Sequence, residues 1–145
     1  MVHVQRTFTV PVEITRIAAY LRDFANAVQW DPGTMTCTQS TPDPIAVGTK
    51  WDNLSKVLGR ETELIYELTQ DAPDHITFVG KNKTATSIDD IRLRKINDES
   101  TELVYVSDVT FNGIAKIAGP ILKFKFEKIG DEMEREMPGI ITANA

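Results

Sequence analysis

The sequence predicts an α+β fold in which an antiparallel sheet packs against one long helix near the C-terminus. Two patterns indicate this fold. Between residues 114 and 137, apolar residues recur at the spacing of a single stripe along an α-helix. The stripe consists of Ala118, Leu122, Phe126, Ile129, Met133 and Met137. Much of the preceding chain alternates between apolar and polar residues, as strands do, so we expect a sheet to cover the stripe.

The length and composition indicate a single domain, residues 1–145, with a core of its own. The chain has 145 residues, of which 41% are hydrophobic and 26% charged, as in ordinary globular proteins. The formal charge of −5 argues against non-specific binding to nucleic acid or to an anionic membrane, because such binding requires concentrated Lys and Arg. We therefore expect no nucleic-acid partner.

The cysteines, histidines and apolar runs exclude further classes. The single cysteine, Cys37, excludes an intrachain disulfide, and with only His3 and His75 beside it we expect no metal site and no cofactor. The first residues contain no basic region followed by a long apolar run, so no signal peptide is expected. No run approaches the ~20 apolar residues of a membrane span. We therefore expect a cytoplasmic protein without stable membrane insertion.

The N-terminal part predicts one strand followed by two helices. Residues Val2–Val10 alternate in polarity, and Pro11 then ends the strand and suits the first turn of a helix. The stripe of this helix consists of Ile14, Ile17, Ala18 and Leu21. Phe24 and Val28 extend the apolar pattern as a second short helix, which ends at the Pro and Gly of residues 30–33.

Six strands follow, and the short turns between them predict antiparallel pairing in sequence order. The predicted strands are 34–40, 49–57, 60–71, 75–81, 84–96 and 101–111. Leu58 and Gly59 form the turn of a hairpin, and a loop with two prolines spans 41–48. Within the C-terminal helix, Gly119 and Pro120 either kink the helix or mark its start.

Period-two alternation indicates which strand residues face the helix. The inward residues of the middle strands are Trp51, Asn53, Ser55, Leu64, Tyr66, Leu68, Asp89, Ile91 and Leu93. In the last strand they are Leu103, Tyr105, Ser107, Val109 and Phe111. On the helix, Ile121 and Phe124 widen the apolar stripe. Asp89 is the one charged residue among these predicted inward positions.

The order of elements and several local motifs resemble a known family. The matching segments are PVEITRIAAYLRDFANAVQWDPG, VGTKW, LGRETELIYEL, DDIRL, YVSDVTFNGIAKIAGPILK and EKIGDEME. Together they resemble the START/Bet v 1-like helix-grip superfamily, also called SRPBCC, and within it the polyketide cyclase/dehydrase branch. Asp89 and Asp108 match aspartates that recur in such sequences.

This resemblance implies a strongly curved seven-stranded sheet that grips the C-terminal helix, with a cavity between them. It also implies a small, largely apolar ligand. It does not imply a reaction, because carriers, hormone receptors and cyclases share this framework, and fold alone does not fix function. No shared catalytic motif can be carried over to this chain.

Asp89 is the main candidate for chemistry. Buried beside apolar groups, its carboxyl would have a raised pKa and could act as a general acid or base. The alternative is that Asp89 lies at a strand end, in water or paired with Arg or Lys. Tyr66 and Tyr105 are candidates to donate hydrogen bonds to a ligand, the alternative being core aromatics with satisfied hydroxyls.

The remaining candidates are positions at which a ligand would meet the cavity wall. Trp51 and Asn53 would supply an aromatic wall and an amide, the alternative for Trp51 being plain packing. The ligand-binding candidates are Trp51, Asn53, Tyr66, Phe78, Asp89, Ile91, Tyr105, Ile121 and Phe124. Trp30 is expected to anchor a turn, and His3 and His75 to be exposed.

Three hypotheses for function follow. The first is a binding protein for a lipid, polyketide or aromatic compound. The second is a cyclase, aromatase or dehydratase, in which Asp89 with Tyr66 or Tyr105 moves protons and the cavity positions the substrate. The third is a protein-interaction module. Asp89 pointing into an enclosed cavity within reach of a tyrosine hydroxyl favours the enzyme, and a purely apolar cavity favours the carrier. A filled interior with an exposed apolar patch favours the module.

Overall fold

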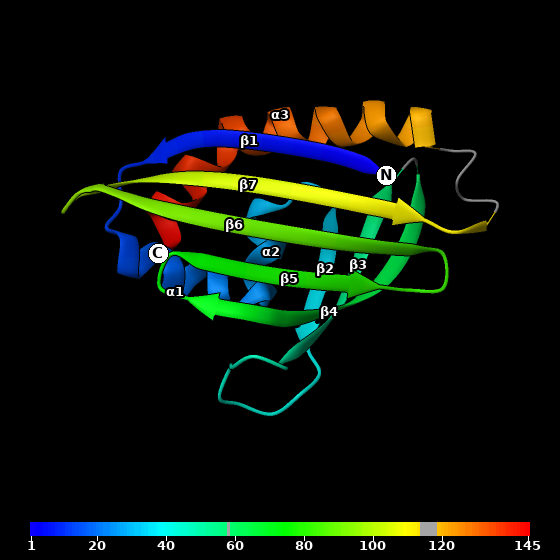
Figure 1. Cartoon of the computed structure of the whole chain (residues 1–145), viewed down its shortest axis with the longest axis horizontal. Helices are drawn as coiled ribbons and strands as arrows, with labels where there is room; N and C mark the ends of the chain where they lie inside the picture. Colours follow the sequence, from blue (N-terminus) through cyan, green and yellow to red (C-terminus); the bar gives the residue numbers. More distant parts are fainter. Residues whose placement is uncertain (58, 114–118) are drawn as a thin grey trace.

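The computed structural model, which describes residues 1–57, 59–113 and 119–145, confirms the α+β fold (Figure 1). One seven-stranded sheet packs against a long C-terminal helix, with two short helical segments after the first strand. The strands are β1 (Val2–Val10), β2 (Thr34–Gln39), β3 (Lys50–Val57), β4 (Arg60–Ala72), β5 (His75–Lys81), β6 (Ala85–Asn97) and β7 (Ser100–Phe111). The helices are α1 (Ile14–Arg22), the 3-10 helix η1 (Phe24–Asn26), α2 (Ala27–Trp30) and α3 (Gly119–Asn144).

The sheet is antiparallel throughout and its strand order is β1-β7-β6-β5-β4-β3-β2. Strands β2 to β7 therefore pair in sequence order, as the short turns predicted. Strand β1 joins the far edge beside β7, and α3 lies along it (Figure 1). Strands β2 and β3 cross the direction of β5, β6 and β7 steeply, which makes the sheet strongly bent (Figure 1).

The C-terminal helix differs from its predicted bounds of 114–137. Helix α3 runs Gly119–Asn144, and 114–118, with the predicted stripe residue Ala118, lie outside the described residues. Pro120 lies in the first turn of α3, where its missing N–H breaks no intrahelical bond. The helix continues through Pro138 because Ile141, one turn beyond Met137, is fully buried and extends the apolar stripe.

The segment after β1 folds as two helical pieces, as predicted, and side-chain caps separate them. The Glu13 carboxylate accepts hydrogen bonds from the first amides of α1, and the Asp23 carboxylate caps η1 in the same way. Phe24 is buried to 1% exposure, but Val28 is 46% exposed, so the predicted continuation of the stripe to Val28 is wrong. The break at Asp23 rotates α2 out of the register of α1.

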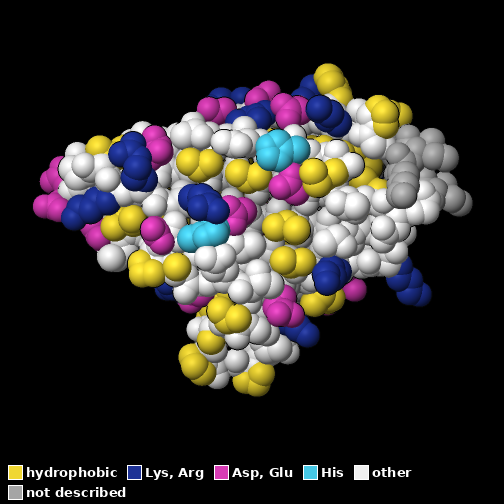
Figure 2. All heavy atoms as spheres, viewed as in Figure 1, with side chains coloured by type: hydrophobic (Ala, Val, Ile, Leu, Met, Phe, Trp, Pro, Cys, Tyr) yellow, Lys and Arg dark blue, Asp and Glu magenta, His cyan; other side chains and the backbone are white. Residues whose placement is uncertain are grey.

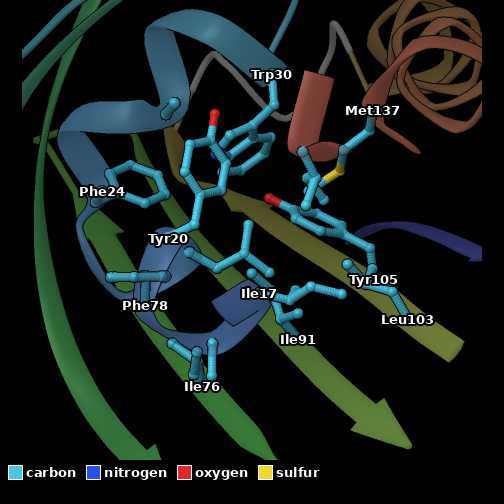
Figure 3. Close-up of a cluster of buried hydrophobic side chains, with 14 of the residues drawn as sticks. Ile17, Tyr20, Phe24, Trp30, Ile76, Phe78, Ile91, Leu103, Tyr105 and Met137 are labelled. Carbon is cyan, nitrogen blue, oxygen red and sulfur yellow. The ribbon is translucent and has the colours of Figure 1, made fainter. Parts of the chain in front are cut away.

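A solid aromatic core occupies the end of the molecule beneath α1, η1 and α2 (Figure 3). Phe24 lies at its centre, with its ring centroid 4.5 Å from those of Tyr66 and Phe78. Trp30 and Trp51 meet Phe24 edge-on at 6.0 and 6.2 Å. Trp30 thus anchors the turn after α2, as expected. This half of the interior is filled by packed side chains.

Helix α3 packs closely against β1 at Gly130. A Cβ atom at this position would lie 2.9 Å from Cγ1 of Val4 and 3.1 Å from Cζ of Arg6. We expect Gly130→Leu to lower the free energy of unfolding by about 2 kcal/mol, because it overpacks this contact. The matched control is Gly139→Leu on the same helix, where a Cβ meets no atom within 4 Å. Urea unfolding measures both, and equal stability of the two variants would contradict this packing.

Candidate functional site

The other half of the interior is a cavity of about 640 Å³ between the sheet and the first half of α3. Its walls are largely apolar and include Val4, Leu64, Val109, Leu122, Phe126 and Met133. The cavity reaches the surface where exposed Arg60 and Thr84 line it, near the β3–β4 hairpin and the β5–β6 turn. A volume of this size is typical of sites for small organic molecules.

A polar cluster around Asp89 interrupts the apolar wall. Asp89 on β6 is only 6% exposed, and its Oδ2 accepts a 2.6 Å hydrogen bond from the hydroxyl of Tyr105 on β7. Its Oδ1 accepts hydrogen bonds from Ser87 at 2.9 Å and from Ser107 at 3.4 Å. Period-two alternation places Ser87 and Asp89 on one face, and antiparallel pairing sets Ser107 opposite Asp89.

The pKa of Asp89 is raised to about 6, mainly by burial and to a lesser extent by the negative charge of Asp31, while the hydrogen bonds from Tyr105 and Ser87 oppose the rise. Among the residues that the structure describes, no Lys or Arg lies within 4.0 Å of this carboxylate. The alternative of a strand end in water or an ion pair is therefore wrong for Asp89. The group accepts a proton readily near neutral pH.

Tyr66 and Tyr105 line the same cavity. Burial, and then the nearby charge of Asp89, raises the pKa of each phenol well above its usual range, so both hydroxyls keep their protons at neutral pH. The Tyr66 ring packs against Gly80, where an added Cβ would lie 2.6 Å from the ring. The structure thus brings together the three residues predicted for chemistry, while their roles stay predictions.

Besides Arg60 at the opening, two charged wall residues, Asp31 and Arg6, were not among the predicted site residues. Asp31 follows α2 and accepts hydrogen bonds from the Gly33 amide and the Thr34 hydroxyl, while burial raises its pKa. Arg6 lines the cavity from β1 and donates to Asp131 of α3 at 2.8 Å. Arg6 could have been found, since it shares the inward phase of the first strand. Asp31 lies in a turn after a helix, where no strand or helix period indicates the direction of its side chain.

Four predicted wall residues lie in the solid core instead of the cavity wall: Trp51, Asn53, Phe78 and Ile91. Trp51 donates from Nε1 to Asp23 at 3.3 Å, and Asn53 donates to the Thr34 hydroxyl at 3.2 Å. All four share the inward phase of their strands. Their placement in the cavity wall was wrong because side chains of α1, η1 and α2 fill the space in front of them (Figure 3).

The expected placement of Ile121 and Phe124 in the wall is also wrong. They are 63% and 64% exposed and do not line the cavity. At about 100° per residue, Leu122 and Phe126 share the side of α3 that faces the cavity, whereas Phe124 points away from it. In these first turns of α3, the apolar side that faces the cavity therefore includes Leu122 and Phe126 but not Ile121 and Phe124.

Both histidines pair with aspartates outside the cavity wall. His3 Nδ1 lies 2.6 Å from Asp108 Oδ1, and His75 Nε2 lies 2.5 Å from Asp90 Oδ1. Asp108 therefore has no place in the cavity, although it matches an aspartate that recurs in similar sequences. His3 is exposed as predicted, whereas His75 is partly buried by its pairing, contrary to expectation.

Within residues 1–57, 59–113 and 119–145, no group of three His, Cys, Asp or Glu side chains is placed to hold a metal ion. In the same part of the chain, no helix has the length and apolar character needed to cross a membrane.

Comparison with known protein families decides the affiliation of the chain. The model of the family described as polyketide cyclase / dehydrase and lipid transport matches residues 1–139. The chain belongs to this family. Membership in the polyketide cyclase/dehydrase and lipid transport family places it among SRPBCC proteins, which bind hydrophobic ligands or act as cyclases. No curated protein matches the sequence significantly.

Solved structures share the fold of this family member at low sequence identity. A START superfamily protein from Mycobacterium smegmatis is 16% identical, with a TM-score of 0.81 and 99% of each chain covered. The Streptomyces aromatase/cyclase Zhui is 15% identical, with a TM-score of 0.79 over 97% of this chain and 93% of its own. A protein from Arthrobacter aurescens is 16% identical, with a TM-score of 0.69 over 99% and 88%. At these identities the similarity concerns the fold.

Proposed function

We propose that this protein binds a hydrophobic small molecule, a lipid, polyketide or aromatic compound, in the cavity between its sheet and α3. The observation that carries the proposal is a cavity of about 640 Å³ whose mainly apolar wall contains one organised polar cluster. Apolar walls supply affinity through the burial of ligand surface, and a few polar groups fix its orientation. Both features are present in the same space.

The polar cluster restricts the chemistry of the ligand. Asp89 and Asp31 both line the cavity, and no Lys or Arg of the described residues pairs with Asp89. A ligand carboxylate beside Asp89 would meet a like charge in a poorly solvated site, which is strongly unfavourable. A neutral hydroxyl or phenol can instead donate to the Asp89 carboxylate. We infer an apolar ligand that carries a neutral donor at the end near Asp89.

A matched pair of probes tests this preference. Naphthol and naphthoate have similar apolar rings, and at pH 8 only naphthoate is charged. We expect naphthol to bind at least about tenfold more tightly, and Asp89→Asn to reduce this ratio because it removes the opposing charge. Isothermal titration calorimetry measures both affinities, and Asp108→Asn outside the cavity is the control. Equal binding of the two probes by the wild-type protein would contradict the role of Asp89.

A second function, a cyclase, aromatase or dehydratase, is favoured by one specific observation. The Asp89 carboxyl has a pKa of about 6 and lies 2.6 Å from the Tyr105 hydroxyl, so this pair can accept and return a proton near neutral pH. On this hypothesis, Asp89→Asn abolishes turnover of a bound polyketide-like substrate while leaving its affinity within a few-fold. Unchanged turnover in that variant excludes the proton-transfer role.

A further inference from the structure

The cations of the described chain differ in their pairing according to position. Cations away from the cavity opening, such as Arg22 and Arg94, lie within 4.0 Å of a carboxylate. Around the opening, several cations have no carboxylate within that distance among the described residues. They include Lys56, Arg60, Lys83, Lys123, Lys125 and Lys128. These side chains come from the β3–β4 hairpin, the β5–β6 turn and the first turns of α3.

Two large apolar side chains stand among these lysines. Ile121 and Phe124 are 63% and 64% exposed on the outer side of α3, and Lys128 Nζ lies 4.8 Å from the centroid of the Phe124 ring. Figure 2 shows hydrophobic and basic side chains mixed over the start of α3, whereas acidic side chains, interspersed with basic ones, appear further along the helix. Exposed apolar residues mixed with Lys are typical of surfaces that lie in a lipid interface.

We propose that this end of the molecule docks onto an anionic lipid surface, with Ile121 and Phe124 entering the interface and the surrounding lysines contacting the head groups. Charge complementarity carries the choice of partner, since these cations have no carboxylate within 4.0 Å inside the described chain. A bilayer rather than an acidic protein is favoured because the exposed apolar pair stands at the same end of the molecule as the cavity opening. Docking there would bring the cavity mouth against the phase in which apolar ligands dissolve.

The net charge of −5 is compatible with this surface because charge changes along α3, whose first turns carry Lys123, Lys125 and Lys128 and whose acidic residues mostly follow. Beyond its first turns α3 is acidic, with Asp131 and Glu134 both turned toward Arg6. Attraction to anionic head groups acts within about one Debye length, roughly 8–10 Å at moderate salt, so the near end of the molecule dominates it. Binding is therefore expected to be reversible and to weaken as salt is raised.

Sedimentation with lipid vesicles tests the proposal using the full chain without added ligand. Vesicles of phosphatidylglycerol and phosphatidylcholine in equal parts should bind the protein, and vesicles of phosphatidylcholine alone should bind it at least about tenfold more weakly. Lys123→Gln with Lys128→Gln should weaken binding to the anionic vesicles by about tenfold or more. Ile121→Ser with Phe124→Ser should weaken it by a similar factor, because apolar burial in the interface is lost.

Matched controls use the same chemistry at other positions. Arg92→Gln with Arg94→Gln removes two charges from the outer part of β6, and Ile88→Ser with Ile96→Ser removes two exposed apolar side chains from the same strand. Neither pair should change vesicle binding by more than about twofold. If the controls weaken binding as much as the α3 variants do, attraction is general and the proposed surface is wrong.

Three further outcomes overturn the proposal: no binding to either vesicle, equal binding to both, or binding that the α3 variants leave unchanged. Binding to immobilised poly-glutamate without binding to anionic vesicles would replace the bilayer with an acidic protein partner. The test is independent of the proposed function, because naphthol affinity is measured without vesicles and should be unchanged in the α3 variants. If the wild-type protein does not bind naphthol, the proposed cavity function is wrong, and the result with vesicles is unaffected.

Discussion

Filling the cavity with larger side chains at Ala85 and Val109 is expected to weaken naphthol binding by about a hundredfold. Both residues line the cavity, and Val109 lies on β7 in the same inward phase as Tyr105 and Ser107. In the double variant Ala85→Phe with Val109→Trp, two rings occupy space that a bound ligand would fill. The loss of roughly 100 Å² of apolar contact corresponds to about a hundredfold in affinity.

Isothermal titration calorimetry measures this loss, and urea unfolding shows that the variant remains folded. The matched control is Ile88→Trp, which enlarges an exposed side chain of β6, where Ile88 is 41% exposed. Since crowding at two positions could disturb folding, the single variant Val109→Trp provides a milder form of the same test. Full naphthol affinity in a folded double variant would show that the ligand binds elsewhere.

Replacing Asp89 with asparagine is expected to stabilise the protein at pH 8 and to have little effect at about pH 4. Burial raises the pKa of Asp89 to about 6 in the folded protein, against roughly 3.9 in an unfolded chain. Between these values the folded state holds a proton that the unfolded chain releases, so the free energy of unfolding falls as pH rises. Above pH 6 the full cost, about 3 kcal/mol, is present in the wild type and absent in Asp89→Asn.

Urea unfolding gives the free energy of unfolding of both proteins at pH 4 and pH 8. The stability difference between variant and wild type at pH 8 is then compared with the difference at pH 4. The amide can still accept from Tyr105 and donate to a serine hydroxyl, so the cluster is largely preserved. The control is Asp74→Asn in the exposed β4–β5 turn, which we expect to shift stability little at either pH. A wild-type protein more stable than Asp89→Asn at pH 8 would contradict the buried, unpaired carboxylate.

The fold could be predicted from the sequence because its elements follow simple periods. Period-two alternation placed Tyr66, Asp89 and Tyr105 on the inner face of the sheet, and all three line the cavity. Helical spacing identified the line from Leu122 to Met133 that faces the same space. Each of these inferences needs only the side-chain direction that a regular backbone imposes.

The division of the interior into a solid half and a hollow half could not be predicted. Trp51 and Phe78 have the same inward phase as Tyr66, but Phe24 from η1 packs against them and closes that end. Phase along a strand says which face a residue is on, but not how far along the sheet the covering helices extend. That extent depends on the break at Asp23, which turns the chain between α1 and η1.

The outer surface of α3 was hidden for a related reason. Ile121 and Phe124 continue the apolar pattern of the helix, so in sequence they are indistinguishable from buried residues. Among the described elements, β1 makes the most extensive contact with α3, and Ile121 and Phe124 lie on the exposed side of the helix. Two apolar residues with no place in the interior are the reason to seek a second, external role for this end.

Native mass spectrometry of protein purified from its own host tests the central claim most directly, that the hollow half of the interior carries an apolar guest. We predict that wild-type protein carries a small-molecule adduct, identifiable after organic extraction as an apolar compound with a neutral hydroxyl or phenol. The Ala85→Phe, Val109→Trp variant, purified in parallel, should lack that adduct. Wild-type protein that is free of any adduct and also fails to bind naphthol would contradict the claim.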